Sequence, residues 1–197
     1  MNLPNKLTVF RIILVPIMVI IPFFNIQGEF LGIPVTMWLI NLIFIIASIT
    51  DKLDGTIARK TNQITTFGKF LDPIADKILV IAAMTMLVEM AKLPAWIPII
   101  VITREFIVSG YRLVAVEKGG KVIAASIWGK LKTVTQMLAI ILAFIDINAF
   151  GAFLVTELTG GALYLNILAT ALMFISVIAT IFSGWDYVKN GKELLKD

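Results

Sequence analysis

Residues 51–76 read DKLDGTIARKTNQITTFGKFLDPIAD, and this stretch decides how the chain can fold. It places four aspartates, two glycines and several basic residues between two segments that are each apolar enough to cross a membrane. An ionised carboxylate at bilayer depth costs about 2.5–3.5 kcal/mol on the most lenient insertion scale, so four together need permanent counter-charges. Bound divalent cations are the simplest source of such charge.

The spacing of the four aspartates predicts a metal site. Asp51 and Asp54 are three residues apart, and Asp72 and Asp76 are four apart, so on helices each pair projects from one face. Two facing helices would then offer four carboxylates to one small volume. Oxygen ligands suit Mg²⁺ or Mn²⁺, which usually share carboxylates with substrate phosphates.

Small and basic residues accompany the acids. Gly55 and Gly68 each lie near one aspartate pair, where the missing Cβ lets a ligand or a second backbone come close. Arg59 could offer a phosphate its planar fork of donors. A polar loop with helix-capping aspartates would explain Asp51 or Asp72 separately, but it would not explain all four in register.

Composition indicates an integral membrane protein. Of the 197 residues, 59% are hydrophobic and only 15% charged, whereas charged residues make up about a quarter of a soluble domain. The chain has no cysteine and no histidine, so acid–base chemistry falls to carboxylates, lysines or tyrosines. The net charge of +4 is spread over the ends of apolar runs, which favours lipid headgroups and phosphorylated substrates over nucleic acid.

Six apolar runs are each near the 20 or so residues that cross the hydrocarbon core. They are residues 7–24, 33–50, 71–90, 94–116, 129–147 and 162–188. Backbone groups must satisfy one another in lipid, so we expect an all-α fold with six transmembrane helices in one domain spanning residues 1–197. A cleaved signal peptide is the alternative for the first run, but Arg11 lies inside it and no small-x-small cleavage site follows.

Positive charge predicts the orientation. Lysines and arginines gather at the start, at the end, and in the second and fourth connections, whereas the other connections carry mainly acids and one lysine, Lys92. Because basic loops stay in the cytoplasm, we expect both termini and the aspartate cluster on that side.

A second group of cations predicts an anion pocket. Arg104 and Arg112 are eight residues apart, close to two helical turns, and so share a face, with Glu105 one residue off it. Lys130 and Lys132 add two charges at the start of the fifth run. Snorkelling toward lipid headgroups is the alternative explanation for these cations.

Written as a pattern, the opening stretch is D-x2-D-G-x2-A-R-x8-G-x3-D-x3-D. Its eight fixed positions are Asp51, Asp54, Gly55, Ala58, Arg59, Gly68, Asp72 and Asp76. This pattern resembles the full signature of the CDP-alcohol phosphotransferase family, with no departure at any fixed position. Flanking segments, Asn5, Thr8 and Arg11 near the start and residues 103–112, resemble the branch of that family that makes phosphatidylglycerol phosphate.

The resemblance implies a reaction. The family transfers a phosphatidyl group from CDP-diacylglycerol to an alcohol and releases CMP, and this branch uses sn-glycerol 3-phosphate. By analogy the four aspartates hold two Mg²⁺ or Mn²⁺ ions and Asp76 takes the proton of the alcohol. Gly55, Ala58, Arg59 and Gly68 lie along the cytidine nucleotide, and Arg104, Arg112, Lys130 and Lys132 bind the acceptor phosphate. The resemblance also implies a homodimer, with an active site that faces the cytoplasm from the plasma membrane.

Three alternatives remain at the level of sequence. A sibling enzyme could use serine, an inositol phosphate or phosphatidylglycerol as the acceptor. A divalent-cation transporter could use the acids as an ion path, although transporters place such groups near the midplane. A purely structural membrane protein would leave the four acids unexplained.

Overall fold

The computed structural model describes residues 2–60, 66–117 and 126–191, and within them it leaves the side chains of residues 4, 52–60, 66, 67, 69, 70, 72, 116 and 190 undescribed. The described chain is all-α apart from one short hairpin, which confirms the predicted class. Its helices are α1 (Leu3–Ile20), α2 (Val35–Lys60), α3 (Thr66–Glu89), α4 (Trp96–Glu117), α5 (Ile127–Ile145) and α6 (Gly160–Asn190).

Each predicted apolar run coincides with one of these helices. The largest difference is at α2, which continues beyond Thr50 through the aspartate motif as far as Lys60. Among the described residues, length and apolar composition alone qualify three segments to cross a membrane, namely Asn5–Phe24, Ile127–Ile145 and Gly160–Lys189. The chain is therefore a membrane protein by the character of its helices.

The short elements lie between the helices. A 3-10 turn, η1 (Ile21–Phe24), follows α1 and leads into the antiparallel strands β1 (Glu29–Phe30) and β2 (Ile33–Pro34). Leu31 and Gly32 make the hairpin turn with positive φ angles of 57° and 74°. A second 3-10 turn, η2 (Ala152–Leu154), lies between α5 and α6.

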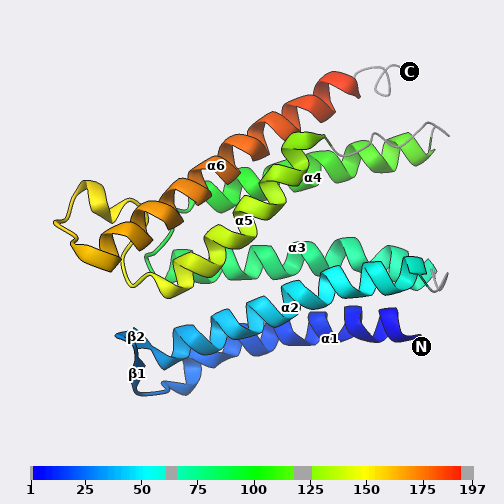
Figure 1. The fold of residues 1–197 in the computed structure, drawn as a ribbon. Coiled ribbons are helices and arrows are strands. Elements are labelled where there is room, and N and C mark those ends of the chain that lie inside the picture. The colour runs from blue at the N-terminus through cyan, green and yellow to red at the C-terminus, as the bar shows by residue number, and fades with distance from the viewer. Residues whose placement is uncertain (1, 61–65, 118–125, 192–197) are drawn as a thin grey trace.

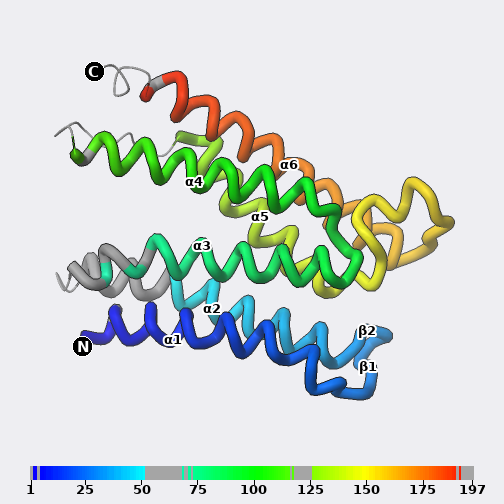
Figure 2. Tube along the Cα trace, turned by 180° about the vertical axis from the view of Figure 1, so that it is seen from behind, coloured from blue at the N-terminus to red at the C-terminus, as the bar shows by residue number. Residues whose placement is uncertain are grey.

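The helices form two groups joined by α5. In Figures 1 and 2, α1, α2 and α3 lie side by side, α4 and α6 form a second group, and α5 runs between the groups. The start of α1 and the end of α6 lie at the same end of the bundle, where α3 and α4 diverge (Figure 1). The η1–hairpin segment and the connections after α3 and α5 lie at the opposite end.

An apolar core holds the two groups together. Met18 of α1, Ile40 and Phe44 of α2, Leu87 of α3 and Phe144 of α5 have no exposed surface or almost none. They belong to one continuous cluster that also includes side chains of α4 and α6. The core fills the bundle away from the diverging ends.

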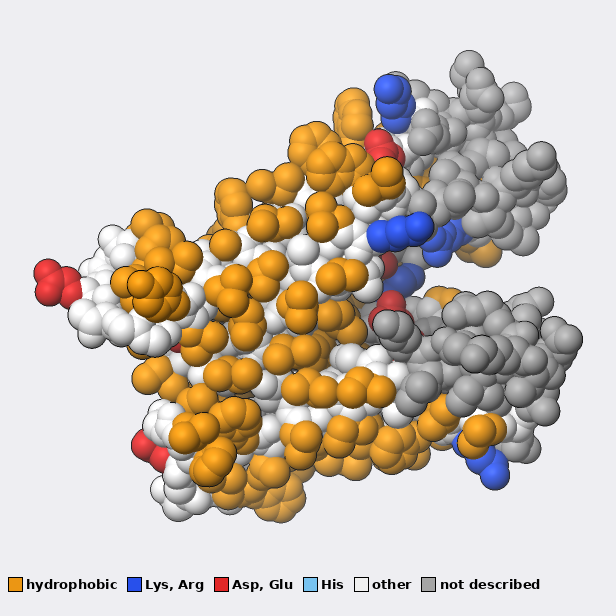
Figure 3. All heavy atoms as spheres, in the orientation of Figure 1, with side chains coloured by type: hydrophobic (Ala, Val, Ile, Leu, Met, Phe, Trp, Pro, Cys, Tyr) orange, Lys and Arg blue, Asp and Glu red, His pale blue; other side chains and the backbone are white. Residues whose placement is uncertain are grey.

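The surface repeats this division. Figure 3 shows a flank covered by hydrophobic side chains, with Lys and Arg at the end where α3 and α4 diverge, around a notch, and with Asp and Glu at both ends. Large apolar side chains such as Ile99, Phe106 and Phe174 are more than half exposed. Such a continuous apolar surface suits lipid and would be costly in water.

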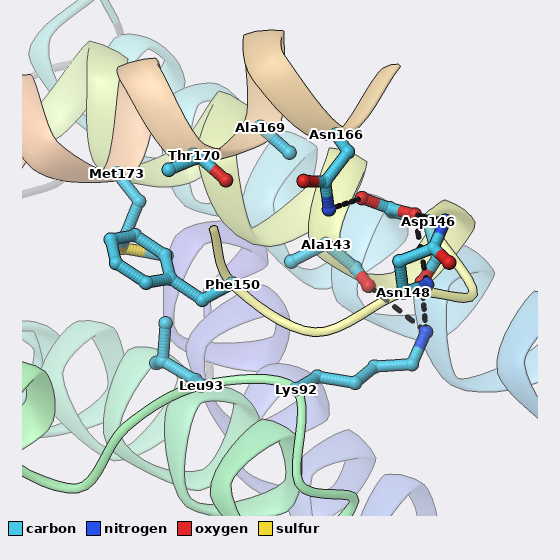
Figure 4. Close-up of a pocket in the computed structure, with 10 residues that line it drawn as sticks. All are labelled: Lys92, Leu93, Ala143, Asp146, Asn148, Phe150, Asn166, Ala169, Thr170 and Met173. Carbon is cyan, nitrogen blue, oxygen red and sulfur yellow. Dashed lines mark hydrogen bonds between the residues drawn. The ribbon is translucent and has the colours of Figure 1, made fainter. Parts of the chain in front are cut away.

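A polar network closes the opposite end of the bundle (Figure 4). The carboxylate of Asp146 accepts hydrogen bonds from the backbone N–H and side-chain amide of Asn148, both at 2.9 Å, and from Asn166 Nδ2 at 2.6 Å. Lys92 Nζ donates to the backbone oxygens of Ala143 and Asp146. Burial lowers the pKa of Lys92 from 10.5 to about 8, and the charge of Asp146 opposes that change.

The network is structural. The cavity beside it measures about 10 Å³, too small for more than a single water molecule. Its hydrogen bonds connect the α3–α4 connection with the end of α5 and with α6, which fixes the closed end of the two groups.

This role predicts that Asp146→Ala lowers stability by about 2–3 kcal/mol, because it removes the carboxylate acceptor of the half-buried Asn148 and of the buried amide nitrogen of Asn166, which keeps its bond to the Ala149 oxygen. Thermal unfolding of the purified protein in detergent measures the loss. Glu157→Ala removes an exposed acid from the same connection and is the matched control. Equal unfolding temperatures for the two variants would contradict the assignment.

Candidate active site

The two halves of the aspartate motif lie on neighbouring helices. Positions 51 and 54 are one turn apart on α2, and positions 72 and 76 are one turn apart on α3, as the spacing predicted. α2 and α3 contact each other. Of the four aspartates, the structure describes the side chains of Asp51 and Asp76; those of Asp54 and Asp72, like Ala58 and Arg59, lie outside the described residues, as does any structural detail at Gly55.

Asp51 is paired with an arginine from the first helix. Arg11 has no exposed surface, and its Nη1 lies 2.7 Å from Asp51 Oδ1. Removing Asp51 would take this counter-charge away from the fully buried Arg11, which is strongly destabilising, whereas the side chain of Asp51 is 38% exposed. The ion pair therefore anchors the start of the motif to α1.

The other predicted residues of α1 share the face of Arg11. Asn5 is 7% exposed and Thr8 is 1% exposed. Asn5, Thr8 and Arg11 follow one another at intervals of three residues, so they lie on the same side of the helix. Gly68, near the start of α3, is also buried. The polar face of α1 therefore points into the bundle that carries the motif.

Asp76 lines a cavity of about 290 Å³ at the diverging ends of the helices. We call it the cationic cavity, because four of its side chains are cations. Its lining residues come from α3, α4, α5 and α6, and those that carry charge are Asp76, Lys77, Arg104, Glu105, Arg112 and Lys132. Asp76 is thus the residue common to the motif and to the cavity.

Asp76 also interacts with charges on other helices. The carboxylates of Asp51 and Glu105 repel it, and Lys132 and Arg11 attract it. Asp51 and Asp76 belong to neighbouring helices and repel each other, so a cation between them would stabilise both. Oxygen is the donor that Mg²⁺ and Mn²⁺ prefer, so these carboxylates are of the chemical type that a divalent ion requires. Among described side chains alone, no three acids converge.

Glu105 organises two of the cations. Its Oε1 accepts from Arg104 Nη1 at 2.9 Å and from Lys132 Nζ of α5. One carboxylate thus connects α4 to α5 and holds two positive groups at the cavity wall. Opposite, Lys77 Nζ of α3 donates to Ser109 Oγ of α4.

Two glycines let helices approach Arg104. A Cβ at Gly184 of α6 would lie 3.3 Å from Arg104 Cγ, and one at Gly129 of α5 would lie 3.4 Å from Ser183 Oγ. Both distances are at or inside the limit of ordinary carbon contacts. The close approach lets Arg104 Nη2 donate to Ser183 Oγ.

The predicted cations do not all line the cationic cavity. Arg104, Arg112 and Lys132 line the cavity, whereas Lys130 is exposed and is not among the lining residues. The reason is helical geometry, because residues two apart on a helix point to nearly opposite sides. The structure adds Lys77 to the set.

The cavity carries an excess of positive charge. Among the described lining residues, four cations face two acids, which leaves two positive charges uncompensated. A phosphate monoester carries about −1.5 to −2 at neutral pH. The cavity therefore suits a phosphate monoester placed beside Asp76.

The sequence profile of the CDP-alcohol phosphatidyltransferase family matches residues 1–182. The chain belongs to this family. The resemblance drawn from the eight-residue signature is thereby confirmed, and the family's general dependence on divalent metal agrees with the four carboxylates of the motif.

Relatives within the CDP-alcohol phosphatidyltransferase family cover nearly the whole chain. A Bacillus subtilis protein named CDP-diacylglycerol–glycerol-3-phosphate 3-phosphatidyltransferase is 43% identical, over 99% of this chain and 97% of its own length. A Haemophilus influenzae protein of the same name is 40% identical over 100% of this chain and 96% of its own. A Mycobacterium tuberculosis protein named probable phosphatidylglycerophosphate synthase is 37% identical over 95% of this chain and 80% of its own.

Sequence reasoning missed Ser183 and Tyr187 of α6, both of which contact arginines of the site. No motif marks them. Their only signal is polarity at the end of an otherwise apolar helix.

Proposed function

We propose that this protein transfers the phosphatidyl group of CDP-diacylglycerol to sn-glycerol 3-phosphate, giving phosphatidylglycerol phosphate and CMP. The relatives that carry this activity in their names match the chain over almost its full length. The observation that carries the proposal is that Asp76, the last motif residue, lines the same cavity as Arg104, Arg112 and Lys132. An acceptor phosphate and the reacting centre can therefore be adjacent.

Asp76 is the proposed general base. Its carboxylate takes the proton of the acceptor hydroxyl while the hydroxyl oxygen bonds to the phosphorus of the phosphatidyl group. The bond from that phosphorus to the CMP oxygen breaks, and its electron pair leaves with CMP. No histidine is present in the chain to take this role.

The four motif aspartates, Asp51, Asp54, Asp72 and Asp76, are the proposed ligands of two divalent ions, Mg²⁺ or Mn²⁺. When bound, these ions neutralise the diphosphate and stabilise the leaving CMP. Arg11 supports the set from α1 by holding Asp51 at 2.7 Å. Gly55, Ala58, Arg59 and Gly68 are the proposed surface for the cytidine nucleotide.

Arg104, Arg112 and Lys132 are the proposed ligands of the acceptor phosphate, with Lys77 on the opposite wall. The two excess positive charges favour an acceptor that carries a phosphate monoester, such as glycerol 3-phosphate or an inositol phosphate, over serine. The alternative of a cation transporter is disfavoured, because the apolar core around Phe44 and Phe144 separates this cavity from the polar network at the other end.

All six helices are proposed to span the membrane, with both termini and the cationic cavity on the cytoplasmic side of the plasma membrane. Of the described lysines and arginines, Lys92 alone lies at the opposite end, beside the acids Glu29, Glu89, Asp146 and Glu157. This asymmetry is typical of an end that faces away from the cytoplasm. The homodimer that the resemblance implies remains a prediction.

The proposed reaction predicts CMP release only when an acceptor and a divalent ion are both present. Purified protein is incubated with CDP-diacylglycerol and, separately, glycerol 3-phosphate, inositol phosphate, serine or phosphatidylglycerol, with Mg²⁺, with Mn²⁺ or with chelator. We expect glycerol 3-phosphate to give the highest rate and chelator to abolish it. A preference for serine would overturn the acceptor assignment, and metal-dependent ion uptake into liposomes without CMP release would favour a transporter.

The phosphate pocket predicts a selective effect of removing its arginines. Arg104→Ala and Arg112→Ala should each raise KM for glycerol 3-phosphate by about 10- to 100-fold, because each loses a charge-assisted hydrogen bond. KM for CDP-diacylglycerol should change little. Lys130→Ala removes an exposed cation of α5 and is the matched control. Equal changes for both substrates would remove the arginines from the acceptor site.

A further inference from the structure

Tyr187 of α6 contacts both arginines of the cationic cavity. Its side chain is almost fully buried, with 1% of its surface exposed. The Cζ atom of Arg104 lies 5.7 Å from the centre of the ring, and that of Arg112 lies 5.6 Å from it. The hydroxyl oxygen also accepts a hydrogen bond from Arg112 Nη2 at 2.8 Å.

These contacts bring together two side chains that begin far apart on α4. Arg104 and Arg112 are eight residues apart on α4, which separates their Cα atoms by about 12 Å along the helix axis. A phosphate group is much smaller than that separation, so both arginines can bind one phosphate only if their side chains converge. Both guanidinium groups lie within 6 Å of a single ring, which is the range of a cation–π contact.

The end of α6 is shaped to hold this arrangement. Ser183, one turn before Tyr187, accepts from Arg104 Nη2, and the absence of a side chain at Gly184 leaves room for the aliphatic part of Arg104. Arg112 is otherwise largely exposed, and a free arginine side chain loses up to about 2 kcal/mol of rotamer entropy when it is ordered. Contact with Tyr187 orders the side chain of Arg112 beforehand, so less rotamer entropy is lost when the ligand binds.

We propose that Tyr187 is a positioning residue that converges Arg104 and Arg112 on the phosphate of the acceptor. This inference rests on the proposed function of the cationic cavity. Tyr187 acts through the arginines and does not itself take part in phosphatidyl transfer. Its ring contacts both arginines, and its hydroxyl accepts a hydrogen bond from Arg112.

The division of roles gives a graded test. Tyr187→Phe keeps the ring and loses the hydrogen bond to Arg112, so KM for glycerol 3-phosphate should rise about threefold. Tyr187→Leu loses the ring as well, and KM should rise about 10- to 30-fold. KM for CDP-diacylglycerol and kcat at saturating acceptor should stay within about twofold of wild type, because the motif aspartates are untouched.

Phe144→Leu is the control for loss of a buried ring. Phe144 has no exposed surface and lies in the core, 12 residues along α5 from Lys132, which is about 18 Å. It should lower the unfolding temperature and leave both KM values unchanged. If Tyr187→Leu fails to fold, Tyr187→Phe decides alone through its selective rise in KM for glycerol 3-phosphate.

Arg104→Ala, measured in parallel, distinguishes the role of Tyr187 from the existence of the phosphate pocket. A selective rise in KM for glycerol 3-phosphate in Arg104→Ala but in neither Tyr187 variant would overturn the role of Tyr187 and leave the phosphate pocket standing. No selective rise in any of the three variants would overturn the pocket itself. A loss of kcat without a change in KM at Tyr187 would also contradict a positioning role.

Discussion

Charges inside a lipid-facing helix bundle persist only where other charges compensate them, and the active end of this protein is arranged by that requirement. Arg11, fully buried, is held by Asp51 at 2.7 Å. Glu105 holds Arg104 and Lys132 together across two helices. These ion pairs set the positions of α1, α4 and α5 around the diverging ends of the bundle, while apolar packing fixes the remainder. In the proposed reaction, the acceptor phosphate would balance the two excess positive charges of the cavity, and metal ions would relieve the mutual repulsion of Asp51 and Asp76.

This arrangement places both substrates of the proposed reaction at one point. The motif on α2 and α3 is the proposed site of the activated lipid, and the arginines of α4 are the proposed site of the acceptor. Asp76 belongs to both the motif and the cationic cavity, since it is the last motif residue and also lines the cavity. A base at that junction can receive the proton of a hydroxyl whose phosphate is already held, which is the gain in rate that proximity provides. The apolar flank suits contact with the bilayer, in which the acyl chains of the lipid substrate lie.

The sequence predicted most of the fold, because lipid permits few alternatives to helices and apolar runs show where they lie. The eight-residue signature identified the family, and helical spacing alone placed Arg104 and Arg112 on one face. Tertiary contacts were harder to predict. Nothing in the spacing of α6 indicates that Tyr187 meets arginines of α4, since that contact depends on how two separate helices cross. The inclusion of Lys130 with Lys132 overlooked that residues two apart on a helix diverge.

The motif aspartates are proposed to hold divalent ions for an activated lipid. Electron paramagnetic resonance of the purified protein in detergent, with CDP-diacylglycerol present, counts the Mn²⁺ ions that they bind. Two bound ions per chain are expected, with at least one lost in Asp72→Asn, because a neutral amide binds the ion weakly. The unfolding temperature of that variant before metal is added shows that it remains folded. Mn²⁺ binding that is absent in the wild type, or unchanged in Asp72→Asn, would contradict the account.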